Sequence, residues 1–258
     1  MSVTVVTGAN SGMGRSCVDL LLGSADHLVA VDLREPEIEG ATGIACDVSD
    51  PEAIRQLIEV VRGLGPFKAL AHAAGISPTM ADARRIFDVN LVGTERLLWA
   101  FEELATVGSA AVCFSSLAAY QIAPFADATM DALIDDPLKD GFLDEASAFT
   151  SDSGFAYGLS KRGVQRTCAR AAVRWGSLGA RVNSVAPGII DTPMGRQELQ
   201  QQPAMHDMLD SAPLRRLGKA AEVAEVVAFL LSDDASFVSG IDVLVDGANL
   251  PGMTAAAP

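Results

Sequence analysis

The stretch Thr7-Gly-Ala-Asn-Ser-Gly-Met-Gly14 lies between the apolar run Val3–Thr7 and a segment of helical period, Met13–Leu22. The run is typical of a strand, so the three glycines stand at a strand-to-helix turn. The first two glycines let the backbone approach a pyrophosphate, and the third lets the helix pack closely on the sheet. The free amides and the positive dipole end of the helix then face the phosphates. This stretch predicts a dinucleotide-binding unit.

The rest of the chain alternates short apolar runs with longer helical patterns. Further strands are expected at Leu28–Val31, Gly43–Cys46, Lys68–Ala74, Ser109–Phe114, Arg181–Val185 and Val243–Val245. Helices are expected from near Pro51 and at Ala83–Leu104, Phe155–Leu178 and Ala220–Leu231. This alternation predicts one α/β domain over residues 1–258, a Rossmann-type, doubly wound parallel sheet with helices on both faces.

One acidic segment, Ala118–Gly154, interrupts the alternation. It holds eight acids and one base, and so contributes −7 of the net charge of −14. Its apolar residues are spaced to form one or two short amphipathic helices. We interpret the segment as an insertion on the surface of the domain.

Composition excludes several classes of protein. The 258 residues are 49% apolar and 20% charged, which excludes a wholly disordered chain. With a net charge of −14, we expect binding neither to nucleic acid nor to an anionic membrane. The four cysteines and three histidines are scattered without metal-ligand spacing, so we expect no metal site and buried, unpaired thiols. We find no signal peptide and no apolar stretch of about 20 residues, so a cytoplasmic location is expected.

The choice of cofactor depends on Asp32, which stands 18 residues after Gly14 at the end of the second strand. A carboxylate at this place accepts hydrogen bonds from the adenosine ribose hydroxyls and repels a 2′-phosphate. Ser11 occupies a loop position where a base would favour the phosphate. These residues favour NAD over NADP, although Arg15 and Arg34 are near enough in sequence to bind a phosphate.

Seven ordered motifs together resemble the short-chain dehydrogenase/reductase family from Val3 to about Gly247. They are Thr7–Gly14, Asp47-Val48, Ala73-Ala-Gly75, Asn90, Ser116, Tyr157 with Lys161, and Pro187-Gly188 with Thr192. Two features depart from the common pattern. His72 stands where the family usually has Asn, and Ser116 and Tyr157 are 41 residues apart because the acidic insertion separates them. This layout resembles the bacterial 3α-hydroxysteroid dehydrogenase/carbonyl reductase subgroup, and coniferyl-alcohol-dehydrogenase-like enzymes share it.

The resemblance implies the site residues. Tyr157 is the acid/base, and Lys161 lies four residues on along the same helix face, where its ammonium would lower the pKa of the phenol. Ser116, rather than its neighbour Ser115, binds the substrate oxygen, and Asn90 holds a proton-relaying water. The implied cofactor-binding residues are Gly8, Ser11, Gly12, Met13, Gly14, Asp32, Leu33, Asp47, Val48, Ala74, Gly75, Tyr157, Lys161, Pro187, Gly188, Ile190 and Thr192.

The substrate side is expected to be apolar. Pro193–Arg216 is rich in methionine and follows the sixth strand, where we expect a mobile lid. Tyr120, Ile122, Phe125 and Phe155 are expected to form the opposite wall.

The sequence thus predicts NAD-linked interconversion of a hydrophobic secondary, aromatic or allylic alcohol and its carbonyl compound. The alternatives are a non-catalytic dinucleotide-binding sensor and an NADP-dependent ketoacyl-type reductase. We expect a homodimer or a homotetramer. The insertion favours the dimer, and the mass in light scattering distinguishes the two.

Overall fold

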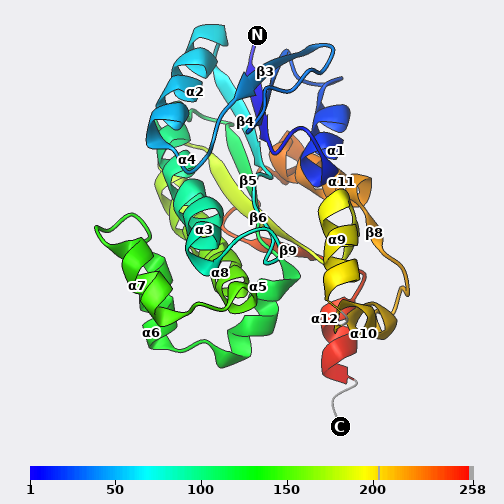
Figure 1. The fold of residues 1–258 in the computed structure, drawn as a ribbon. Coiled ribbons are helices and arrows are strands. Elements are labelled where there is room, and N and C mark those ends of the chain that lie inside the picture. The colour runs from blue at the N-terminus through cyan, green and yellow to red at the C-terminus, as the bar shows by residue number, and fades with distance from the viewer. Residues whose placement is uncertain (203, 256–258) are drawn as a thin grey trace.

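A seven-stranded sheet forms the centre of the computed structural model, which describes residues 1–202 and 204–255 (Figure 1). The strand order is β3-β2-β1-β4-β5-β6-β9, and every neighbouring pair is parallel. The strands are β1 (Val3–Thr7), β2 (His27–Asp32), β3 (Ala41–Ala45), β4 (Phe67–His72), β5 (Ala110–Phe114), β6 (Arg181–Pro187) and β9 (Asp242–Val245). Two-residue strands, β7 (Ile190–Asp191) and β8 (Gly218–Lys219), form a separate parallel pair.

Helices cover both faces of the sheet, as the alternation predicted. The helices are α1 (Gly12–Leu21), α2 (Pro51–Leu64), α3 (Ala83–Phe87), α4 (Gly93–Glu102), α5 (Leu117–Ile122), α6 (Ala128–Asp135), α7 (Phe142–Phe149), α8 (Ser153–Gly176), α9 (Pro193–Gln201), α10 (Ala204–Ser211), α11 (Ala220–Leu231) and α12 (Asn249–Ala255). One apolar core packs α2, α4 and α8 on the sheet, and the other packs α1 and α11 on the opposite face. The chain order reverses between β1 and β4, which opens a crevice at their carboxyl ends.

The helix expected over Ala83–Leu104 is not continuous. It divides into α3, a π-helical segment at Asp88–Val92, and α4. A single π-helical turn widens the backbone and often marks a functional position. Here the wide turn contains Asn90.

The insertion folds into α6 and α7, matching the two short helices expected, and α5 with a 3-10 turn (Ala123–Phe125) precedes them. Acidic side chains of α6 pair with basic ones of α8. Asp131 accepts a hydrogen bond from Arg162 Nε at 2.8 Å, and Asp135 accepts one from Arg166 Nε at 2.7 Å. These pairs hold the insertion on α8, and a third apolar core lies beneath it.

Two further findings concern the described part of the chain. All four cysteines are buried and unpaired there. Among the helices of residues 1–202 and 204–255, none is both long enough and apolar enough to cross a bilayer.

Candidate active site

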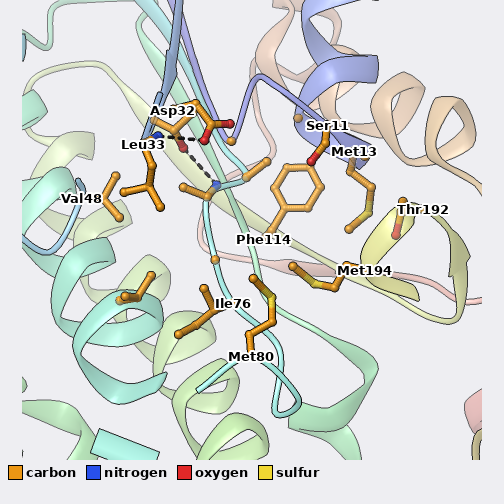
Figure 2. A pocket seen from close by; sticks show the side chains of 18 of the residues that line it. Ser11, Met13, Asp32, Leu33, Val48, Ile76, Met80, Phe114, Thr192 and Met194 are labelled. Atoms are coloured by element: carbon orange, nitrogen blue, oxygen red, sulfur yellow. Dashed lines mark hydrogen bonds between the residues drawn. The ribbon is translucent and has the colours of Figure 1, made fainter. Parts of the chain in front are cut away.

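A cavity of about 400 Å³ opens at the carboxyl ends of the central strands (Figure 2). Most of the predicted cofactor residues line it: Gly8, Ser11, Gly12, Met13, Gly14, Asp32, Leu33, Asp47, Val48, Ala74, Gly75, Tyr157, Lys161 and Thr192. Three predicted residues do not line it, namely Pro187, Gly188 and Ile190. Pro187 and Ile190 are buried in short strands, and Ile190 lines a separate cavity with Gly218. Their side chains therefore serve packing in this structure.

The conformation and packing of the glycine loop exclude side chains at its glycine positions. Gly8 has a φ of +70° and Gly12 a φ of +56°, a region that side chains disfavour. A Cβ on Gly14 would lie 2.1 Å from the carbonyl oxygen of Gly8. The start of α1 is therefore pressed against the loop, and its free amides face the cavity. This cradle fits the pyrophosphate of a dinucleotide.

Asp32 closes the other end of the loop. Its Oδ2 accepts a hydrogen bond from Asn10 N at 2.9 Å, and its Oδ1 accepts one from Leu33 N at 2.8 Å. Figure 2 shows the bond between Leu33 and Asp32 at the edge of the cavity. Each carboxylate oxygen keeps a further lone pair for a hydroxyl of a ligand. Arg15 is bound elsewhere, since its Nε lies 2.8 Å from Asp19 Oδ1.

The two serines after β5 have different partners. Ser115 donates to Asp242 Oδ1 at 2.8 Å, which occupies its only proton. Ser116 caps α5 by accepting from Ala118 N at 3.2 Å, and its hydroxyl acts to lower the pKa of Tyr157. Ser116 is therefore the serine that acts on Tyr157, although Ser115 rather than Ser116 contributes to the cavity lining.

Tyr157 and Lys161 lie one turn apart on α8, but their electrostatics differ from the expectation. Lys161 is buried and donates to the Phe114 carbonyl at 2.8 Å, with Nζ 5.9 Å from the centroid of the Tyr157 ring. Burial lowers the pKa of Lys161 to about 8. Burial, and then the charge of Glu198, raise the pKa of Tyr157 to about 12, while its hydrogen bond to Ser116 opposes the rise. The net shift of the Tyr157 pKa is therefore upward, opposite to the lowering expected from Lys161.

Asn90 lies behind the cavity rather than in its wall. Its Oδ1 accepts from Ile76 N at 2.8 Å, and its Nδ2 donates to the Ile76 carbonyl at 2.9 Å. A Cβ on Gly75 would lie 3.1 Å from Asn90 Oδ1 and 3.3 Å from Lys161 Nζ. Asn90 thus fixes the turn after β4 directly beside the Lys161 ammonium.

His72 extends this network in one direction. The single proton of the Thr94 hydroxyl goes to the Asn90 carbonyl at 2.7 Å, so Thr94 accepts from His72 Nε2 at 3.0 Å. His72 Nδ1 is then an acceptor for the Thr7 hydroxyl at 2.8 Å, and Thr7 in turn accepts from Ala74 N at 3.1 Å. The imidazole therefore joins β1, β4 and the π-helical segment as the neutral Nε2–H tautomer.

This tautomer has a consequence for acid stability. Burial, and then the Lys161 charge, lower the pKa of His72 from 6.5 to about 3. Below about pH 6.5, His72 takes up a proton in the unfolded chain but not in the folded one. The contribution of His72 to the free energy of unfolding is therefore complete above pH 6.5 and is lost as the pH falls toward 3. Urea unfolding should show stability falling with acid by up to about 1.4 kcal/mol per pH unit. His72→Gln should remove the part of this acid dependence that comes from His72. His206 is exposed, so His206→Gln should keep it. An unchanged acid slope in His72→Gln would contradict this assignment.

Comparison with known proteins decides the family. A family model described as short chain dehydrogenase matches residues 2–126, and one described as enoyl-(acyl carrier protein) reductase matches residues 144–248. The short-chain dehydrogenase/reductase bsc3 of Alternaria brassicicola is 35% identical over 216 residues, which are 79% of this chain and 76% of that protein. The chain belongs to the short-chain dehydrogenase/reductase family.

Within this family, relatives with hydroxysteroid activity in their names support the predicted subgroup. The 3-alpha-hydroxysteroid dehydrogenase/carbonyl reductase of Comamonas testosteroni is 30% identical over 261 residues, with 96% of each chain covered. The structure of the 3-alpha-hydroxysteroid dehydrogenase from Pseudomonas sp. B-0831 complexed with NADH superposes with a TM-score of 0.84. It is 29% identical and covers 100% of both chains. The chain is thus an oxidoreductase of the short-chain dehydrogenase/reductase family.

The cavity wall expected from Tyr120, Ile122, Phe125 and Phe155 is not formed by these residues. Ile122 is 8% exposed and packs in the core beneath the insertion, while Phe125 is 74% exposed. Tyr120 donates to Asp242 Oδ2 at 2.8 Å, and Phe155 packs on Phe149. None of the four lines the cavity described above. The four residues lie on α5, the following 3-10 turn and α8, and the packing of these elements directs them away from the cavity. That packing cannot be inferred from a local sequence pattern.

Two lining residues that sequence reasoning missed are Arg85 and Met80. Arg85 Nη2 lies 2.8 Å from Asp47 Oδ2, and its Nη1 lies 2.8 Å from Asp88 Oδ2. The guanidinium therefore fixes the turn after β3 to the start of the π-helical segment. The helical pattern over Ala83–Leu104 does not reveal this role of Arg85, because only the folded chain brings Arg85 to Asp47.

Proposed function

We propose that the protein interconverts a hydrophobic secondary alcohol and its carbonyl compound, using NAD or NADH as the hydride carrier. One observation carries the proposal: Tyr157 and Lys161 line the same cavity as Asp32 and the glycine loop. A dinucleotide lying along that cavity from Asp32 past the glycine loop would bring its reactive ring to Tyr157. The dinucleotide complex of the 3-alpha-hydroxysteroid dehydrogenase supports this reading.

Tyr157 is the proton acceptor in our proposal. In oxidation, the alcohol gives its hydroxyl proton to the phenolate of Tyr157, and in reduction the phenol returns it to the carbonyl oxygen. Ser116 donates a hydrogen bond to the same oxygen, so that it faces Tyr157 and its developing charge is stabilised. When bound, a nicotinamide dinucleotide would supply the hydride acceptor or donor and, in its oxidised form, a positive charge in this region.

Tyr157 needs that added charge, because its pKa in this structure is about 12. A phenol with so high a pKa is a sparse base at neutral pH. The Lys161 ammonium is already fixed by the Phe114 carbonyl, so it contributes from a set position. Asn90 holds the turn beside Lys161, and we propose that the water relaying protons to Lys161 lies at this turn.

The preference for NAD rests on Asp32. A 2′-phosphate placed where the ribose hydroxyl binds would meet the Asp32 carboxylate, and Arg15 is held away by Asp19. We expect Asp32→Ala to weaken NADH binding roughly tenfold through lost hydrogen bonds, and to strengthen NADPH binding. Fluorescence titration with both cofactors measures the ratio. Asp19→Ala is the control, because it frees Arg15 and leaves Asp32 in place. If wild type prefers NADPH, this part of the proposal is wrong.

The apolar substrate is supported by the cavity wall next to Tyr157. Ile76, Met80 and Met194 line it, and Figure 2 shows the two methionines extending into the same space near Phe114. Methionine side chains adapt to the shape of apolar ligands. A secondary alcohol with hydrocarbon substituents therefore fits this wall better than a sugar does.

A further inference from the structure

One carboxylate on the substrate side remains unexplained by this chemistry. It belongs to Glu198 in α9, the helix that stands across from α5 and α8 in Figure 1. Thr192 caps this helix by accepting from Gly195 N at 3.0 Å. A Cβ on Gly195 would lie 2.2 Å from the Ile190 carbonyl, so one face of α9 is pressed on the chain beneath it. The rotation of the helix is therefore set.

Helical spacing then decides which way Glu198 faces. Met194 lines the cavity, and Glu198 follows it by four residues, which places both on one face. Arg196 and Gln200 are exposed, lie on the opposite face, and Arg196 Nε pairs there with Asp191 at 2.6 Å. Glu198 itself is half-buried. Glu198 therefore lies on the Met194 side of α9, beside the cavity, although it is not itself a lining residue.

Glu198 has no counter-charge in that position. Within residues 1–202 and 204–255, its carboxylate takes part in no hydrogen bond and no ion pair. Burial raises the pKa of Glu198, and its charge in turn raises the pKa of Tyr157. The Glu198 carboxylate thus opposes formation of the Tyr157 phenolate.

We propose that Glu198 is a specificity-determining residue that binds a protonated amine on the substrate, so that the preferred substrates are hydrophobic amino alcohols or amino ketones. The inference rests on the proposed function and names the substrate class of the same site. A bound ammonium ion supplies the missing partner of Glu198 and removes its opposition to the Tyr157 phenolate. The methionine wall packs on the hydrocarbon part of such a ligand, and the net charge of −14 favours the approach of a cation.

Two ketones of nearly the same shape test this proposal. N-methyl-4-piperidone carries a protonated amine, and 4-methylcyclohexanone has carbon in its place. With NADH at neutral pH, the wild-type kcat/KM should favour the amine roughly tenfold, as for a hydrogen bond to a charged group. Glu198→Gln keeps the size of the side chain and should bring the ratio near one. Asp207→Asn removes an exposed charge from α10 and should leave the ratio as in wild type.

The ratio of the two kcat/KM values distinguishes recognition of the amine from a structural role of Glu198, because a structural change would lower kcat/KM equally for both ketones. A wild-type ratio near one, or a ratio that survives in Glu198→Gln, overturns the inference. Calorimetric titration of both ketones into the NADH-loaded protein gives the same comparison without turnover. If neither ketone is reduced while NADH is bound, the proposed reaction fails for these substrates, and the binding ratio still decides the role of Glu198.

Discussion

Replacement of Tyr157 by Phe should lower kcat by roughly 10²–10⁴-fold, the range that a general acid–base contributes. Phe keeps the ring and removes only the hydroxyl, the group whose pKa Ser116 lowers. The proton of the alcohol then has no acceptor at this place. The measurement is initial rate with NAD and a hydrophobic alcohol, together with NADH affinity from fluorescence, which should change little.

The chain supplies a matched control for this variant. Tyr120 is the other of its two tyrosines, and its hydroxyl donates to Asp242 rather than facing the cavity. Tyr120→Phe should retain most of the kcat. Comparable loss in both variants, or full activity in Tyr157→Phe, would show that Tyr157 is not the acid/base.

Gly14→Ala should have the largest effect on cofactor binding and on stability. The new Cβ would lie 2.1 Å from the Gly8 carbonyl oxygen and 2.6 Å from its carbon, both backbone atoms. The loop and α1 must separate, at a cost of about 3 kcal/mol or more for an overpacked contact. We expect a lower urea midpoint and loss of NADH binding, measured by unfolding and by fluorescence titration.

Gly23→Ala provides the comparison, because a Cβ at that position has no atom within 4 Å. It lies in the turn after the same helix, and its substitution should be neutral or slightly stabilising. Unaltered NADH affinity in Gly14→Ala would show that the tight contact between α1 and the loop does not shape the phosphate cradle.

The fold was predictable because its signals are local. The glycine loop, the strand–helix alternation and the position of Asp32 each depend on residues close together in sequence. The π-helical turn around Asn90 was not predictable, because the pattern over Ala83–Leu104 has an unbroken helical period. In the folded chain, Asn90 within this turn bonds to both backbone groups of Ile76, a contact that the helical pattern does not reveal.

The same limit applies to the site. The residue types of Ser116, Tyr157 and Lys161 follow from motif spacing, and the structure brings them together. The His72 network needs Thr7 and Thr94 from two other elements, so the sequence alone could not say whether His72 replaces the usual Asn. The inward face of Glu198 likewise depends on how α9 packs. A helical pattern gives the face that two residues share, and packing decides where that face points.

The most direct test of the central claim is the formation of NADH by wild-type protein from NAD and a panel of hydrophobic secondary alcohols, with and without an amine, followed by absorbance of the reduced nicotinamide. We predict turnover with NAD, slower turnover with NADP, and its loss in Tyr157→Phe. NADH binding without turnover of any alcohol or of the corresponding ketones would contradict the account and would favour a dinucleotide-binding protein without catalysis.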